Sequence, residues 1–203
     1  FYVMDLGTGS SLNAVYNELI RRYEKKALSF RNVVIFNAYE YYPLQKDSSI
    51  RTINQLKERF LNHVDVEEQN IFTLDGFVAQ DAVQDCCRLY EQRIKTFGGL
   101  DVALIGIGRS GNIAANEPGS GIQSATRLIL IGNTSREEME ASEKTKESIP
   151  PCSLTMGIAT ILSAKAIYLT AWGEEKAEIM QKVIENSITD TLPASFLQTH
   201  PNV

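Results

Sequence analysis

Residues 102–120 read VALIGIGRSGNIAANEPGS, and this stretch decides the fold of the chain. The apolar run from Val102 to Ile107 indicates a buried strand, which continues directly into a loop that ends in the turn Asn-Glu-Pro-Gly. In an α/β protein, a loop of this kind leaves the carboxyl end of a central strand, where ligands bind. Glycines let the backbone approach a ligand closely, and we expect those of this loop to line a pocket: Gly106, Gly108 and Gly111.

Apolar, strand-like runs alternate with segments of helical period along the rest of the chain. We expect strands at residues 2–6, 33–36, 71–74, 102–107, 127–131 and 166–171. We expect helices near residues 12–26, 49–62, 81–97, 136–148 and 174–186. This alternation predicts an α/β fold of three layers, with a mostly parallel sheet and helices on both faces. No repeat or linker divides the sequence, so residues 1–203 are expected to form one domain.

The composition argues against several classes of protein. The net charge is −5 and the basic residues are scattered, so we expect no nucleic-acid partner. The apolar stretches are much shorter than a membrane span, so we expect no membrane association. Cys86, Cys87 and Cys152 form neither a disulfide framework nor a zinc-binding pattern, which is typical of a cytoplasmic protein. His63 and His200 lack ligand-like neighbours, so no metal site is expected.

The two ends of the sequence are unusual. Phe1 is not an initiator methionine and directly precedes an expected strand. The sequence stops at Val203 without a closing element. We therefore expect the chain to be a piece of a longer polypeptide, to which a second domain could be fused.

A second glycine-containing loop joins the first expected strand to the first expected helix. Small residues let the backbone approach a ligand, and a helix N-terminus offers N–H groups to a phosphate. A tight turn with a serine cap would explain the same residues. The loop has neither the dinucleotide fingerprint nor the P-loop pattern. The candidate phosphate-binding residues are Gly7, Thr8, Gly9, Ser10 and Ser11.

Three charged side chains are candidates for the same site, and each also has an ordinary explanation. Glu40 follows the second expected strand and is either a pocket carboxylate or a solvated one. Glu117 is either an acid or base or a turn carboxylate, and Lys176 is either a phosphate ligand or a surface lysine. The polar segment at residues 133–149 is either a solvated helix or a lid over the site.

Several of these motifs together resemble the glucosamine-6-phosphate deaminase (isomerase) family. The most specific is Gly-Ile-Gly-x-x-Gly-x-Ile-Ala-x-Asn-Glu-Pro at residues 106–118, whose Asn-Glu-Pro end favours the deaminases over the related 6-phosphogluconolactonases. Further matches are FNAYEY at residues 36–41, LTMGI at residues 154–158, and the pair Gly173 and Lys176. The resemblance covers nearly the whole chain.

This resemblance implies a Rossmann-like fold with a phosphosugar pocket at the carboxyl end of the sheet. Enzymes of the family, hydrolases of amino-sugar metabolism, open the ring of glucosamine 6-phosphate and move a proton between C1 and C2. They release ammonia to give fructose 6-phosphate, without a metal or organic cofactor. The resemblance also implies a homo-oligomer, phosphate binding by residues 7–11 and Lys176, and a lid at residues 133–149. The lid arginine of the family aligns with Ala141, although Arg136 lies nearby.

The chain departs from the family at the positions that transfer protons. The family has an aspartate where this chain has Tyr39, and an aspartate and a histidine where it has Ser110 and Asn112; Glu117 matches. A phenol with a pKa of about 10 is a poor base at neutral pH, and an amide does not titrate. We therefore expect the usual isomerisation and deamination to be lost or altered.

Three functions are consistent with these residues. The first is a phosphosugar-binding protein in which Ser110 and Asn112 hydrogen-bond to hydroxyls of glucosamine 6-phosphate or a similar ligand. The second is an active deaminase that relies on displaced groups, namely Glu117, Glu40 and Tyr39. The third is a regulatory domain of a larger multidomain protein.

Overall fold

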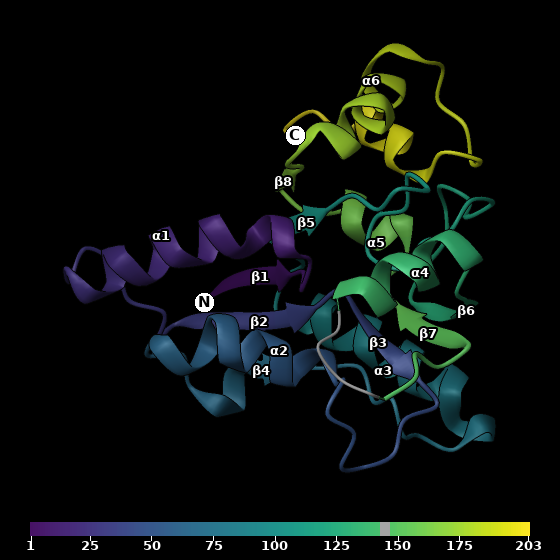
Figure 1. Ribbon diagram of the computed structural model, residues 1–203. Helices are drawn as coiled ribbons and strands as arrows, with labels where there is room; N and C mark the ends of the chain where they lie inside the picture. Colours follow the sequence, from purple (N-terminus) through teal and green to yellow (C-terminus); the bar gives the residue numbers. More distant parts are fainter. Residues whose placement is uncertain (143–146) are drawn as a thin grey trace.

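The computed structural model describes residues 1–142 and 147–203 and has an α/β fold (Figure 1). Within these residues, the main sheet has five parallel strands in the order β4-β2-β1-β5-β8. The strands are β1 (Tyr2–Leu6), β2 (Val33–Asn37), β4 (Ile71–Phe72), β5 (Val102–Gly106) and β8 (Ala166–Thr170). The apolar runs of the sequence therefore predict the strands of this sheet correctly.

Helices cover both faces of the main sheet because its central strands carry apolar side chains on each face. On β1, Met4 and Leu6 belong to the same buried cluster as side chains of α1 and α2, whereas Val3 packs with side chains of α3 and α5. These helices are α1 (Asn13–Glu24), α2 (Thr52–Arg59), α3 (Val83–Thr96) and α5 (Ile158–Leu162). The prediction of a mostly parallel sheet with helices on both faces is confirmed.

A second sheet of the described residues has three antiparallel strands in the order β3-β7-β6. The strands are β3 (Tyr39–Tyr42), β7 (Cys152–Thr155) and β6 (Arg127–Leu130). The sequence predicts the strand at residues 127–131 but neither of the other two. The apolar pattern predicts no strand at residues 39–42, because YEYY lacks an apolar run, yet this segment pairs through its backbone with β7.

The remaining helices lie near the carboxyl ends of the strands of the main sheet (Figure 1). α4 (Asn133–Ser142) begins earlier than the predicted helix at residues 136–148, and residues 143–146 lie outside the described ones. The chain also has short 3₁₀ segments. No described helix is long and apolar enough to cross a membrane. The other bounds are α6 (Ala177–Glu185), Ser10–Leu12, Leu61–His63, Glu68–Asn70, Gln80–Ala82, Glu174–Lys176 and Pro193–Thr199.

Candidate active site

A cavity of about 630 Å³ lies at the carboxyl ends of β1, β5 and β8. These strands are parallel neighbours, so the loops that follow them meet at one edge of the sheet. Residues 7–11 and most of residues 105–112 line the cavity, together with residues 170–172. Side chains of α4 and Lys176 complete its wall. The two glycine-containing loops singled out in the sequence therefore belong to one site.

The loop at residues 7–11 is held in place by buried hydrogen bonds. The Gly7 N–H donates to the Leu104 carbonyl oxygen at 2.9 Å, and the Tyr16 hydroxyl donates to the Gly7 carbonyl oxygen at 2.5 Å. A side chain at Gly7 would bring a Cβ atom to 3.1 Å from the Leu104 carbonyl oxygen, so the close packing favours glycine. Within the described part of the chain, no hydrogen bond is donated by the N–H groups of Thr8, Gly9 and Ser10. Such unused N–H groups are the donors that a phosphate requires.

Tyr39 lines the cavity and contacts this loop. Its hydroxyl oxygen accepts a hydrogen bond from Thr8 Oγ1 at 3.1 Å. The Arg59 guanidinium donates to the Thr8 carbonyl oxygen from the other side of the chain. The Tyr39 phenol therefore supports the loop at residues 7–11.

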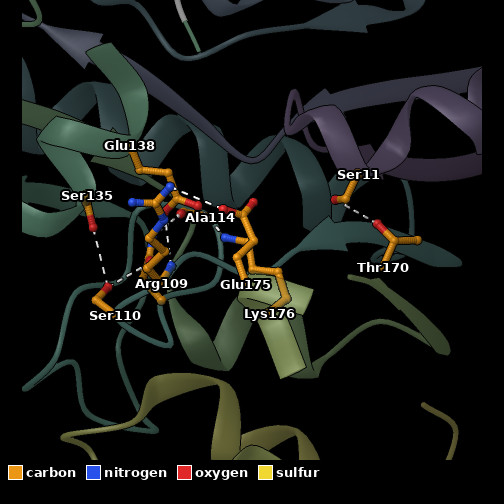
Figure 2. A network of polar contacts seen from close by, with 10 residues as sticks. Ser11, Arg109, Ser110, Ala114, Ser135, Glu138, Thr170, Glu175 and Lys176 are labelled. Carbon is orange, nitrogen blue, oxygen red and sulfur yellow. Dashed lines mark hydrogen bonds and ion pairs between the residues drawn. The ribbon is translucent and has the colours of Figure 1, made fainter. Parts of the chain in front are cut away.

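Ser11 is fixed by residues that follow β8. Thr170 Oγ1 donates to Ser11 Oγ at 2.9 Å, and Trp172 Nε1–H donates to the Ser11 carbonyl oxygen at 2.6 Å (Figure 2 draws the first bond). Gly106 must lack a side chain here, since a Cβ atom would lie 2.8 Å from Ser11 Oγ. Sequence reasoning missed Thr170 and Trp172, which come into the site only because β8 pairs with β5.

Ser110 and Asn112, two of the candidate site residues, hydrogen-bond to each other. Ser110 Oγ donates to Asn112 Oδ1 at 2.8 Å and lies 3.4 Å from Ser135 Oγ of α4. Asn112 Nδ2 donates to the Ala114 carbonyl oxygen at 3.2 Å. Gly108 allows this arrangement, because a Cβ atom there would lie 1.9 Å from Asn112 Oδ1. Asn112 reaches the cavity lining, whereas Ser110 lies behind it.

Two further predicted residues lie outside the cavity lining. The expectation that Gly111 lines the pocket is wrong, because Gly111 faces Leu192: a Cβ atom there would lie 2.2 Å from Leu192 Cδ1. Glu117 is buried, with 8% of its surface exposed, and its carboxylate lies against Gly132. Among the described residues, Glu117 Oε1 has no hydrogen-bond partner.

Glu40 is neither a pocket carboxylate nor a solvated one. It is 1% exposed, and its carboxylate accepts hydrogen bonds from the Thr52 N–H at 3.0 Å, the Thr52 hydroxyl at 3.0 Å and the Tyr41 N–H at 3.0 Å. Burial raises the pKa of Glu40 to about 7, although these hydrogen bonds act to lower it. Its side chain joins β3 to the first turn of α2, away from the cavity lining.

Charged side chains that line the cavity form a network (Figure 2). The Lys176 ammonium pairs with the Glu138 carboxylate, whose Oε2 also accepts the Arg109 N–H at 2.9 Å. The Arg109 guanidinium pairs with Glu175 at 3.2 Å. The Lys176 side chain is only 11% exposed, so the first ion pair is well shielded from water, whereas the second is half exposed. Lys176 therefore lies in the site, but with an acidic partner.

Glu138 and Ser135 are absent from the sequence-based candidates. A polar helix of mixed charge is typical of a solvated surface, so its sequence does not indicate that these two side chains line a cavity. The cavity-lining residues of α4 are Ser135, Glu138, Met139, Ala141 and Ser142, and no local pattern in the sequence separates them from the exposed residues of this helix.

Comparison with known proteins identifies the family. A family model described as glucosamine-6-phosphate isomerases/6-phosphogluconolactonase matches residues 4–203. The chain belongs to this family. A glucosamine-6-phosphate deaminase-like protein of Bacteroides thetaiotaomicron is 55% identical over 202 residues, which are 100% of this chain and 30% of that protein. Glucosamine-6-phosphate deaminase of Oceanobacillus iheyensis is 36% identical over 201 residues, covering 99% of this chain and 80% of the enzyme.

Solved structures agree with this assignment. A monomeric glucosamine-6-phosphate deaminase is similar with a TM-score of 0.93 and 36% identity, over 100% of this chain and 83% of that one. The 6-phosphogluconolactonase of Thermotoga maritima shares the fold, with a TM-score of 0.73 and 17% identity over 96% of this chain and 79% of the other. The chain thus spans less than a third of the Bacteroides relative and most of the deaminases.

Proposed function

We propose that this chain binds a phosphosugar, glucosamine 6-phosphate or a close relative, in the cavity and does not deaminate it by the usual proton-transfer route of its family. The deaminase names of relatives at 36% identity support the ligand class. The unused N–H groups of Thr8, Gly9 and Ser10, with Lys176 in the same cavity lining, support the binding of its phosphate.

One observation supports the absence of the usual deamination: the described cavity lining offers no unpaired carboxylate or imidazole to act as a base. Its carboxylates, Glu138 and Glu175, each pair with a cation. Asn112 does not titrate, and it is engaged with Ser110. A general base must accept a proton at the reacting atom, and paired or neutral groups do this poorly.

A second candidate is an active deaminase that relies on Glu117. The observation in its favour is the buried Glu117 Oε1, which has no hydrogen-bond partner among the described residues. An oxygen without a partner is available to a hydrogen-bond donor of a ligand. The side chain would have to turn from Gly132 toward the cavity in order to reach a sugar ring.

Calorimetric titration with glucosamine 6-phosphate and fructose 6-phosphate, run beside an ammonia-release assay, tests the proposal. We expect binding that is lost in Lys176→Ala and retained in Lys182→Ala, whose ammonium lies on the exposed face of α6. We expect ammonia release far below the roughly 1 to 10³ per second of typical enzymes. Turnover in that range, abolished by Glu117→Gln, would instead establish the second candidate.

A further inference from the structure

The Glu138 carboxylate occupies a set of donors that suits an anionic ligand. One of its oxygens contacts the Lys176 ammonium, and the other accepts the backbone N–H of Arg109 at 2.9 Å (Figure 2). A cation together with a backbone N–H at a loop is the pair of groups that binds phosphate in many proteins. The cavity thus already contains an anion supplied by its own chain.

The charges of the cavity lining are balanced. Its described charged residues are two cations, Arg109 and Lys176, and two anions, Glu138 and Glu175. The pair of Arg109 with Glu175 is half exposed and therefore screened by water. The pair of Lys176 with Glu138 is more deeply buried, with 11% and 27% of the side-chain surfaces exposed, so its charges interact more strongly. Lys176 is the cation that would bind the phosphate of a phosphosugar, and Glu138 already occupies it.

We propose that Glu138 is an internal anion of this cavity, which a phosphosugar must displace from Lys176 in order to bind. This inference rests on the proposed function, since it takes Lys176 as the phosphate ligand. A phosphate that enters beside Glu138 is repelled by the carboxylate, and such like-charge contacts weaken binding substantially. Displacement also breaks the contact of Glu138 with the Arg109 N–H, so binding loosens α4 from the loop that follows β5.

The decisive variant is Glu138→Gln, which keeps the shape of the side chain and removes its charge. Glu137→Gln is the matched control, because Glu137 lies on the same helix and is exposed. Calorimetric titration with glucosamine 6-phosphate and with inorganic phosphate should give at least about tenfold tighter binding to Glu138→Gln than to the unaltered chain or the control. Adding Lys176→Ala to Glu138→Gln should remove the gain.

The outcomes separate this inference from the proposed function. Equal binding to the unaltered chain and to Glu138→Gln overturns the inference and leaves the proposed function standing. Binding to Glu138→Gln alone supports the inference and shows that the unaltered chain is not a phosphosugar-binding protein. Binding to neither chain overturns both.

A measurement on the unaltered chain avoids any dependence on the folding of a variant. Amide hydrogen exchange of residues 133–142, measured with and without saturating glucosamine 6-phosphate, reports on the attachment of α4. We expect faster exchange with the ligand, because Glu138 is then released. Unchanged exchange in α4 under saturating ligand would overturn the inference.

Discussion

The two halves of the cavity differ in the kind of group that they present. The phosphate half, residues 7–11 with Lys176, presents backbone N–H groups and one ammonium. The proton-transfer half, named for the positions at which the family resemblance implies proton transfer, presents the Tyr39 phenol and the Asn112 amide, whereas Ser110 and Glu117 lie outside the cavity lining. Anion binding by backbone groups depends on the path of the chain, whereas proton transfer depends on the identity of each side chain. The same fold can therefore keep one ability while it loses the other.

Restoring the titratable groups of the family should produce the largest effect. We expect the combined substitution Tyr39→Asp, Ser110→Asp and Asn112→His to raise ammonia release from glucosamine 6-phosphate by at least about 100-fold, because each general acid or base contributes roughly 10²- to 10⁴-fold. All three are needed together, since such groups act as a unit.

The control for this variant is the same triple substitution with Glu117→Gln, which should lose the gained activity. Circular dichroism and phosphosugar titration would verify that fold and binding are intact. A folded, ligand-binding triple variant without any gain would show that the backbone of the proton-transfer half, and not its residue types, limits the reaction.

A buried carboxyl group lies close in sequence to each half. Asp5 of β1 lies two residues before Gly7, is fully buried, and has no hydrogen-bond partner on either oxygen among the described residues. Burial raises its pKa from 3.8 to about 8. Glu40 of β3, next to Tyr39, is satisfied by Thr52, and its pKa is raised from 4.5 to about 7. The cost of burying the carboxyl group is thus offset by hydrogen bonds at Glu40 but not at Asp5.

Asp5→Asn should flatten the pH dependence of stability. The pKa of Asp5 is higher in the folded chain than in the unfolded one. Its contribution to the free energy of unfolding is therefore complete below pH 3.8 and is lost as the pH rises to about 8. Between about pH 5 and pH 7 the free energy of unfolding should fall by about 1.4 kcal/mol per pH unit because of this group. Urea unfolding at several pH values measures the slope, which should be shallower by that amount in Asp5→Asn. The slope that Glu40 causes has the same sign and should remain; equal slopes in the two chains would disprove the assignment.

The sequence predicts the scaffold better than the site, for physical reasons that particular residues illustrate. The strands β1 and β5 are buried on both faces, so their composition alone identifies them. The strand β3 contains Glu40, whose burial depends on hydrogen bonds from Thr52, a partner 12 residues away. Local pattern cannot show such a partner.

The same reasoning applies within the cavity. From the sequence, the loop at residues 7–11 could be placed because glycine-containing loops that precede a helix have local signatures, and Lys176 because of the family resemblance. Glu138 could not, because its importance comes from Lys176, which is 38 residues further along the chain. A charged residue on a polar helix has no local feature that distinguishes it from its exposed neighbours.

The smallest predicted effect concerns the boundary between the two halves. The resemblance implies that Tyr39 occupies the family's position for the base, yet its hydroxyl accepts a hydrogen bond from Thr8 of the phosphate half. If this contact is its role, Tyr39→Phe should lower the free energy of unfolding by about 1 kcal/mol, the net value of one hydrogen bond, and should weaken phosphosugar binding slightly. Tyr168→Phe, at a hydroxyl on an exposed side chain, should change neither quantity. Urea unfolding and calorimetry measure both. Unchanged stability together with a loss of measurable turnover in Tyr39→Phe would instead assign the Tyr39 hydroxyl a role in proton transfer, because only a catalytic phenol would behave in that way.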